Sequence, residues 1–310
     1  MIKSITVTNY LNKSITIELS RPEKSGLAVI SIDGIGPVKA NVSTSKLASH
    51  DGSVFNSARL DERDINMTLE LMPVPSKDEI STVEKVRHLV YKYFPIKRPV
   101  RVEFETDTRS VYVNGIVDDD QPNIFSEKER MTISIRCPDP WFYSVKETNT
   151  TFSGIVPKFV FPFSSPVGNP SLHMGEIVTN TINNIYYEGD NESGVIISIH
   201  AIGPATHLRI YNINTHESMS IDDDKLLAIT GSKIKASDDI IINTRQNSKK
   251  ITLIREGIKY NILNTLNKNP SWFTVNKGDN QFAFMADDDD VSNPLNLRFD
   301  IETVNTYEGV

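Results

Sequence analysis

The residues whose type and spacing could support metal binding or catalysis are three runs of consecutive aspartates: Asp118–Asp120, Asp222–Asp224 and Asp287–Asp290. Clustered carboxylates are typical of Ca²⁺ sites, and a suitably separated pair catalyses glycoside hydrolysis. None of the runs has the EF-hand spacing, and each follows an apolar stretch that reads as a strand. We therefore interpret all three as solvated turns, with a Ca²⁺ site as the first alternative and a catalytic pair as the second.

The six histidines do not form a second candidate site. None belongs to an HExxH motif or to a His-x-His pair, so solvated or core-edge positions are favoured for all of them: His50, His88, His173, His200, His207 and His216. The chain also lacks a GxSxG elbow, a Walker loop and a GxGxxG motif. The sequence thus predicts no catalytic, metal-binding or cofactor-binding residue, no cofactor and no enzymatic activity, and it leaves ligand-binding residues unassigned.

The composition excludes several further classes of protein. Hydrophobic residues make up 38% of the 310 residues and charged residues 24%, which is typical of a soluble globular protein. The net charge of −7 argues against a surface that binds duplex nucleic acid, because such a surface needs clustered Lys and Arg. The single cysteine, Cys137, excludes an intrachain disulfide framework and a multi-thiolate metal site.

No membrane or export segment is expected. Residues Met1–Val7 alternate between polar and apolar side chains, which predicts a strand instead of a signal peptide. No apolar run approaches the roughly 18 residues that a membrane span requires. We expect a protein that is made in a cytoplasm and has no membrane partner.

Alternating polar and apolar side chains predict that the first part of the chain is mainly β. The expected strands lie within 5–19 (two strands), 27–32, 38–47, 63–71, 100–104, 111–117 and 130–136. A glycine-turn loop at His50–Ser57 is expected to be anchored by Phe55. One long helix interrupts the strands at about 76–94, with Ser76 and Glu79 as a capping box and Pro95 as its stop. Its apolar stripe is expected to cover one face of the sheet.

A rigid corner at Arg136–Phe142 is expected to close this first domain at residue 146. Pro138 and Pro140 each remove a backbone donor and disfavour continuation of the strand before them. Trp141 and Phe142 follow at once and need to be covered by other parts of the chain. A strand that ends in such a corner is a natural point for a second domain to begin.

The rest of the chain is expected to contain a connection and a second β domain. Residues 147–176 read as a proline-rich arm or linker, punctuated by prolines 157, 162, 166 and 170. Residues 177–310 carry about eight short strands at the spacing of a β-sandwich. These strands are expected at 177–182, 195–201, 208–213, 218–221, 239–242, 251–255, 280–285 and 295–301. Trp272 is expected to plug one end of this core.

The order of several short motifs resembles the distal tail protein (Dit) family of long-tailed phages that infect Gram-positive bacteria. In the first domain the motifs are Gly34–Pro37, Asp51-Gly52 with Phe55–Ser57, Arg63–Ile65, Tyr93–Pro95, Thr106–Arg109, Gly115 and, above all, Cys137–Phe142. In the second they are Gly189-Asp190, Asp239–Thr244, Ser271–Phe273, Lys277–Asn280 and Tyr307–Val310.

That resemblance implies a mainly β protein with two β-sandwich domains: a belt domain, residues 1–146, with one covering helix, and a galectin-like domain, residues 177–310. It implies a hexameric ring at the tail tip that joins the tail tube protein to the tail-associated hub protein and docks receptor-binding or baseplate proteins. DNA would only pass through the ring, and no enzymatic activity is implied. The protein would belong to the virion and be assembled in the host bacterial cytoplasm. Exposed sheet edges are a plausible means of closing such a ring.

Two other functions stay open at this point. One is a carbohydrate-binding adhesin that contacts the host cell wall. However, a galectin sugar site needs a Trp-Gly-x-Glu sequence, which is absent, so sugar binding is not carried over from the resemblance. The other is a wall-degrading enzyme. The aspartate runs are the only residues that suggest it.

Overall fold

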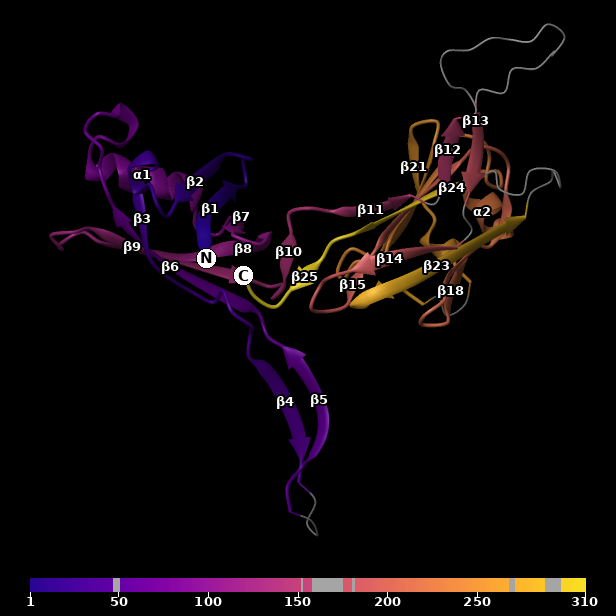
Figure 1. The fold of residues 1–310 in the computed structure, drawn as a ribbon, viewed down its shortest axis with the longest axis horizontal. Coiled ribbons are helices and arrows are strands. Elements are labelled where there is room, and N and C mark those ends of the chain that lie inside the picture. The colour runs from indigo at the N-terminus through magenta and orange to yellow at the C-terminus, as the bar shows by residue number, and fades with distance from the viewer. Residues whose placement is uncertain (47–50, 152, 158–174, 180–181, 268–270, 288–296) are drawn as a thin grey trace, which may run out of the picture. The chain divides into compact units, whose positions relative to one another are not determined.

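The computed structural model describes residues 1–46, 51–151, 153–157, 175–179, 182–267, 271–287 and 297–310 (Figure 1). The chain forms two compact units. The first contains Met1–Lys146 together with Thr306–Val310, and the second contains Glu147–Asn305. The second unit is therefore an insertion in the chain of the first, and the last five residues return to the unit in which the chain begins.

The first unit is built on one antiparallel sheet in which seven strands follow the order β2-β1-β7-β8-β9-β6-β3. The strands are β1 (Ile2–Asn9), β2 (Ser14–Glu18), β3 (Leu27–Asp33), β6 (Arg63–Leu71), β7 (Pro99–Thr106), β8 (Ser110–Asn123) and β9 (Arg130–Cys137). Two short strands, β10 (Phe142–Ser144) and β25 (Thr306–Tyr307), extend it beside β8. The alternation in the sequence thus predicted these long strands correctly.

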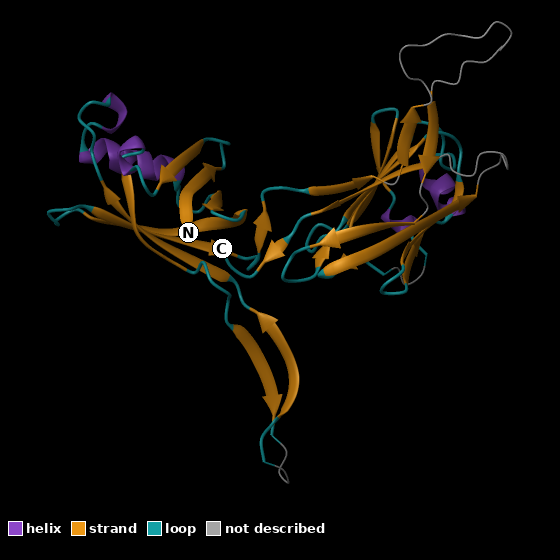
Figure 2. Ribbon diagram, in the orientation of Figure 1, coloured by secondary structure: helices purple, strands orange, loops and turns teal. Residues whose placement is uncertain are grey.

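Helix α1 (Val83–Tyr93) covers one face of this sheet, as expected (Figures 1 and 2). Val86, Val90 and Phe94 are buried against inward side chains of the strands, such as Ile133 and Val102. The expected range 76–94 is too long at its start. Thr82 is the N-cap and accepts a hydrogen bond from the Lys85 N–H, whereas residues Asp78–Ile80 form a separate 3-10 turn. The Ser76–Glu79 capping box is therefore wrong, because a better cap follows it.

Polar side chains dominate the opposite face of the sheet. Hydroxyl pairs join neighbouring strands there: Thr6 with Thr16 at 3.0 Å, and Thr8 with Ser14 at 2.9 Å. Carboxylates and arginines from adjacent strands also pair on it, as between Arg136 and Asp64 at 3.3 Å. This face is suited to contact with water.

The second unit is a β-sandwich. Its six-stranded sheet has the order β11-β24-β16-β19-β20-β21, and its four-stranded sheet has the order β14-β23-β17-β18. The first sheet contains β11 (Thr148–Thr151), β16 (Ile196–Ala201), β19 (Asp239–Asn243), β20 (Lys250–Arg255), β21 (Ile258–Asn261) and β24 (Leu297–Thr303). The second contains β14 (Ile182–Tyr187), β17 (Thr206–Asn212), β18 (Glu217–Ser220) and β23 (Gly278–Asp287). Phe284 and Phe299 stack across the core.

Three smaller features complete this unit. Short pairs are formed by β12 (Ser153–Pro157) with β13 (Gly175–Thr179), and by β15 (Ser193–Gly194) with β22 (Thr274–Val275). A second helix, α2 (Asp223–Thr230), was not predicted. At the corner where Trp272 was expected to plug the core, the fully buried ring is Phe273, and Trp272 lies partly buried against the same cluster.

These units differ from the expected domain ranges at two places. The range 147–176 contains strands β11 and β12, and prolines 162, 166 and 170 fall outside the described residues. Residues 306–310 pack with the first unit, because their backbone groups find partners there. In the described part of the chain, no helix is both long enough and apolar enough to cross a membrane.

Candidate functional site

The corner after β9 is the place where motifs from distant parts of the sequence meet. Strand β6 begins at Arg63, which lies opposite Cys137 at the end of β9. Arg63 is only 2% exposed, although its long side chain ends in a charged guanidinium group. It is in phase with Ile65, Met67 and Leu69, which are the buried positions of the same strand.

The guanidinium of Arg63 binds four main-chain carbonyls. Its Nε donates to the oxygen of Pro140 at 2.7 Å, and Nη2 donates to that of Glu308 at 2.7 Å. Nη1 donates to the oxygens of Gly36, at 2.6 Å, and Gly34. The same group lies 4.3 Å from the centre of the Phe142 ring, a cation–π distance. One side chain thus joins three segments that are far apart in the sequence; we call this cluster the Arg63 junction.

No described carboxylate lies within ion-pair distance of Arg63. Burial lowers the pKa of its guanidinium, yet an arginine stays charged in proteins. Its charge is therefore compensated by carbonyl dipoles and by the Phe142 ring. A planar group with five N–H donors can serve four acceptors at once, which a lysine cannot do.

Gly34 is required at this junction for a backbone reason. Its φ is +83°, and a Cβ added to it would lie 2.0 Å from the carbonyl oxygen of Asp64. Only glycine fits so close to a neighbouring backbone in this conformation.

The C-terminal segment forms the other side of the junction. Strand β25 pairs with β10, and the Val310 N–H donates to the Ile35 carbonyl at 3.0 Å. Arg109 donates to the Gly309 carbonyl at 3.0 Å and lies 4.4 Å from the Tyr307 ring centre. These contacts hold the return of the chain against Gly34–Gly36. The sequence had not indicated them, although an arginine in phase with buried positions was a usable sign.

A long hairpin leaves the first unit directly beside the junction. It consists of β4 (Ala40–Ser45) and β5 (Val54–Leu60), which begin after Gly36 and end before Arg63. Its strands pair with each other and with no other described strand. Figure 1 shows it projecting away from the sheet. Val42, Val54 and Phe55 are at least half exposed, so the expectation that Phe55 anchors a loop is wrong. We call this hairpin the arm.

The aspartate runs do not form the solvated turns that were expected. Asp118–Asp120 continue strand β8, because β9 supplies backbone partners as far as Asn123. Asp222–Asp224 begin helix α2, with Asp222 capping the N–H groups of Asp224 and Lys225. Asp287 ends β23, and residues 288–290 lie outside the described part of the chain.

Asp120 is half-buried, and neither of its carboxylate oxygens has a hydrogen-bond partner among the described residues. Burial, and then repulsion from Asp119, raises the pKa of Asp120 from 3.8 to about 6. The folded state therefore binds this proton more tightly than the unfolded state does. Ionising Asp120 in the fold costs stability, and this cost grows between about pH 4 and pH 6 and is complete above that range.

We expect Asp120→Asn to raise the free energy of unfolding at pH 7.5 by about 2 kcal/mol. A pKa shift of about two units corresponds to about 3 kcal/mol, and the partial exposure of Asp120 lowers this figure through solvent screening. At pH 4 the variant and the wild type should unfold together, because the wild-type carboxyl is then mostly protonated in the fold. Urea unfolding at both pH values tests this. The matched control is Asp118→Asn, which removes an equal charge from an exposed pair with Arg136 and should change stability by less than about 1 kcal/mol. A gain in unfolding free energy of equal size at both pH values would show that the raised pKa of Asp120 is not its cause.

The histidines and the cysteine are not brought together as a reactive group. His200 pairs with Asp239 at 2.7 Å, His207 with Asp287 at 2.9 Å, and His88 lies beside Tyr91. His50 and His173 lie outside the described residues. Burial raises the pKa of the Cys137 thiol to about 12, so it is not a nucleophile. In the part of the chain that is described, no three His, Cys, Asp or Glu residues are arranged to hold a metal ion.

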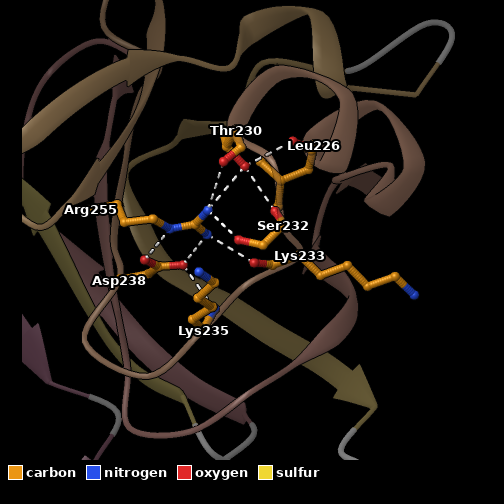
Figure 3. A network of polar contacts seen from close by, with 7 residues as sticks. All are labelled: Leu226, Thr230, Ser232, Lys233, Lys235, Asp238 and Arg255. Carbon is orange, nitrogen blue, oxygen red and sulfur yellow. Dashed lines mark hydrogen bonds and ion pairs between the residues drawn. The ribbon is translucent and has the colours of Figure 1, made fainter.

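A second buried arginine stabilises the other unit (Figure 3). Arg255 binds Asp238 through two hydrogen bonds, from Nε at 2.8 Å and from Nη2 at 2.5 Å. It also donates to Ser232 Oγ and to the Lys233 carbonyl, while Asp238 accepts from the Lys235 N–H. Asp238 is 1% exposed. This network fixes the loop between α2 and β19.

Comparison with known proteins identifies the fold. No family model matches the sequence, and no curated protein matches it. The structure is similar to that of the Dit protein of phage SPP1, described as a paradigm of the hub adsorption apparatus in phages that infect Gram-positive bacteria. The TM-score is 0.63 at 10% sequence identity, over 97% of this chain and 98% of that one. The resemblance in fold that the motifs implied is thus confirmed.

Two further matches are chains of the phage p2 baseplate in its activated conformation. The form with strontium has a TM-score of 0.46 at 11% identity, over 97% of both chains. The form with calcium has a TM-score of 0.48 at 12% identity, over 97% of this chain and 98% of that one.

Proposed function

We propose that this chain is a structural distal tail protein of a bacteriophage. The observation that carries the proposal is the match in fold to SPP1 Dit, which extends over nearly the whole of both chains and includes both units. The buried thiol, the dispersed histidines and the mainly structural roles of the aspartates agree with a non-enzymatic function without a cofactor.

In this proposal the first unit, residues 1–146 with 306–310, is the belt domain that forms a hexameric ring at the tail tip. The arm supports this part of the proposal. A hairpin of two strands is at best marginally stable in water, yet this one exposes Val42, Val54 and Phe55. A second copy of the chain is the occupant that would cover these side chains in every subunit of a closed ring.

The polar face of the first sheet is the surface that we assign to the bore of the ring. Its hydroxyl pairs stay hydrated, and the exposed carboxylate of Glu105, which has no ion-pair partner among the described residues, repels the phosphate backbone. DNA would then pass without adhering. A ring structure in which helix α1 lines the bore would overturn this assignment.

The second unit would be the galectin-like sandwich. The ring would join the tail tube protein to the tail-associated hub protein, and the sandwich would dock receptor-binding or baseplate proteins. The protein would belong to the virion at the tail tip, after assembly in the cytoplasm of the host bacterium, with no membrane partner.

The ring is tested by light scattering and negative-stain imaging of the purified chain. We expect a six-fold particle with a central opening and six times the 34.8 kDa mass of the chain. Phe55→Asp should shift this particle towards monomers, because it places a charge in the covered side of the arm. Phe125→Asp is the matched control, since Phe125 is 98% exposed in the turn between β8 and β9 and lies outside the arm. Equal assembly of both variants would remove the arm from the contact, and a wild type that stays monomeric in the presence of its tail tube protein would contradict the ring.

A further inference from the structure

A small polar pocket in the second unit has features that the proposed tail role does not use. It has a volume of about 220 Å³ and lies between strand β17, the first turn of helix α2 and the segment that contains Asn267. Its lining includes His207, Arg209, Asp223, Asp224, Lys233 and Asn267.

A β-bulge shapes the wall of this pocket. The register between β17 and β23 shifts between Thr206 and Arg209, and His207 within the bulge has a φ of +53°. This left-handed conformation directs the His207 N–H to Asp223 Oδ2, at 2.9 Å. Bulges often re-aim groups beside binding sites, and strained residues of this kind persist only where neighbouring contacts hold them.

Asp223 is the buried acceptor of the pocket. The residue is 7% exposed, and its Oδ1 is buried without a hydrogen-bond partner among the described residues. The imidazole of His207 is 3.9 Å from the other oxygen, Oδ2, and its Nδ1 lies 2.9 Å from Asp287. No described lysine or arginine is within 4 Å of Asp223. A buried carboxylate oxygen without a protein donor takes one from a ligand or from an ordered water.

Two other acceptors line the same pocket. Asn267 donates its amide N–H to Ser220 Oγ, which leaves its side-chain carbonyl oxygen as an acceptor. Asp224 is exposed, whereas Asp222 is engaged as the helix cap. Arg209 and Lys233 make the lining mixed in charge: with Asp222 engaged as the helix cap, Asp223 and Asp224 balance these two cations. The acceptors that remain, on Asp223 and Asn267, call for a donor, and an ionised donor makes the stronger hydrogen bond to a carboxylate.

The pocket adjoins an apolar strip on the outer face of the four-stranded sheet. Ile182 and Tyr211 both lie opposite Ala283 on neighbouring strands, and Met285 lies opposite Arg209. Ile182 is 57% exposed and Met285 is 60% exposed. Arg209 belongs to both the strip and the pocket. Arg209 and Met285 are exposed and Tyr211 is partly buried. Tyr, Met and Arg beside apolar side chains are typical of the centre of a protein–protein interface.

We propose that this pocket receives a lysine or arginine side chain of a partner protein, whose flanking apolar side chains pack on Ile182, Tyr211 and Met285. The basic group donates to Asp223 Oδ1 and to Asn267. The inference rests on the proposed function for the kind of partner, a protein component of the tail tip, and it adds the surface and the chemistry of the contact.

The test is methyl NMR of the full chain with labelled isoleucines, which remains feasible in a large assembly. The probe is Nα-acetyl-lysine methylamide, and the uncharged control probe is the norleucine analogue. We expect the lysine probe to shift Ile221, which lines the pocket, in a saturable manner, with Ile65 of the first unit unchanged. Asp223→Asn should weaken this binding roughly tenfold, because a charge-assisted contact is lost while the bond to His207 can persist. Asp190→Asn, which removes the same charge from an exposed turn, should leave it unchanged.

The inference is overturned by equal effects of both probes, by lysine shifts that do not include Ile221, or by wild-type affinity in a folded Asp223→Asn variant. If that variant does not fold, the comparison of the two probes on the wild type decides. A response to cell-wall oligosaccharide but not to the lysine probe would also overturn it. A chain that forms the ring but lacks the lysine response would exclude only the docking site. A lysine response from a chain that stays monomeric in the presence of its tail tube protein would leave the site and contradict the ring.

Discussion

Replacing Arg63 by methionine is expected to lower the free energy of unfolding of the first unit by about 3 to 5 kcal/mol. Methionine fills a similar length but leaves the carbonyls of Gly34, Gly36, Pro140 and Glu308 without their donor in a buried place. Each orphaned acceptor has a desolvation cost. Removing the guanidinium also removes the free-energy cost of burying its charge, and this offsets part of the loss. The net loss in unfolding free energy is therefore well below the sum of four separate penalties.

Chemical unfolding followed by circular dichroism measures the loss, and hydrogen exchange locates it. Amide exchange should accelerate at Ile35 and at Tyr307–Val310, which the junction holds, and remain unchanged in the core of the second unit. Arg136→Met is the matched control, because Arg136 is about half exposed and its ion pairs with Glu62, Asp64 and Asp118 lie in water. It should cost less than about 1 kcal/mol. Equal losses for the two variants would exclude the junction as a main source of stability.

Asp238→Asn is expected to destabilise the second unit by a similar amount, about 3 to 5 kcal/mol. Asparagine has the same shape and can still accept from the Lys235 N–H, so the change mainly removes the charge that faces Arg255. The guanidinium would then be buried without a counter-ion. Asp238 also raises the pKa of Arg255 through their hydrogen bonds, which is the expected direction for a cation stabilised by its partner.

A double-mutant cycle with Arg255→Met measures this coupling. Because removing both charges leaves neither of them unpaired, the double variant should be more stable than the sum of the two single changes predicts. Asp190→Asn serves as the control, since the pair of Asp190 with Lys277 is exposed and should contribute less than about 1 kcal/mol. Additive effects of the two single changes would mean that the pair is not coupled.

The two buried arginines show that similar positions are stabilised by different means. Each is in phase with the buried residues of its strand: Arg63 with Ile65 in β6, and Arg255 with Leu253 in β20. Arg255 has a carboxylate partner, whereas Arg63 is surrounded by carbonyls from segments that are remote in sequence. The first arrangement stabilises a loop within one unit, and the second holds the base of the arm and the end of the chain together.

The sequence by itself determined the elements whose pattern is local. Period-two alternation identified the long strands of both units, and the apolar stripe within 83–93 identified the covering helix. The start of this helix was predicted too early because Ser76 and Thr82 are both possible N-caps. Helix α2 was missed because Asp222–Asp224 read equally well as a turn or as the capped first turn of a helix.

Only the tertiary structure decided what the polar and charged residues do. Burial of Asp120 depends on how far β9 extends beside β8, and the surroundings of Arg63 depend on the return of residues 306–310 to the first unit. The exposure of Phe55 depends on the absence of any described strand beside the arm. A local pattern fixes the side of a strand on which a residue lies, but the free energy of a charge or an apolar side chain depends on which distant segments come to lie against it.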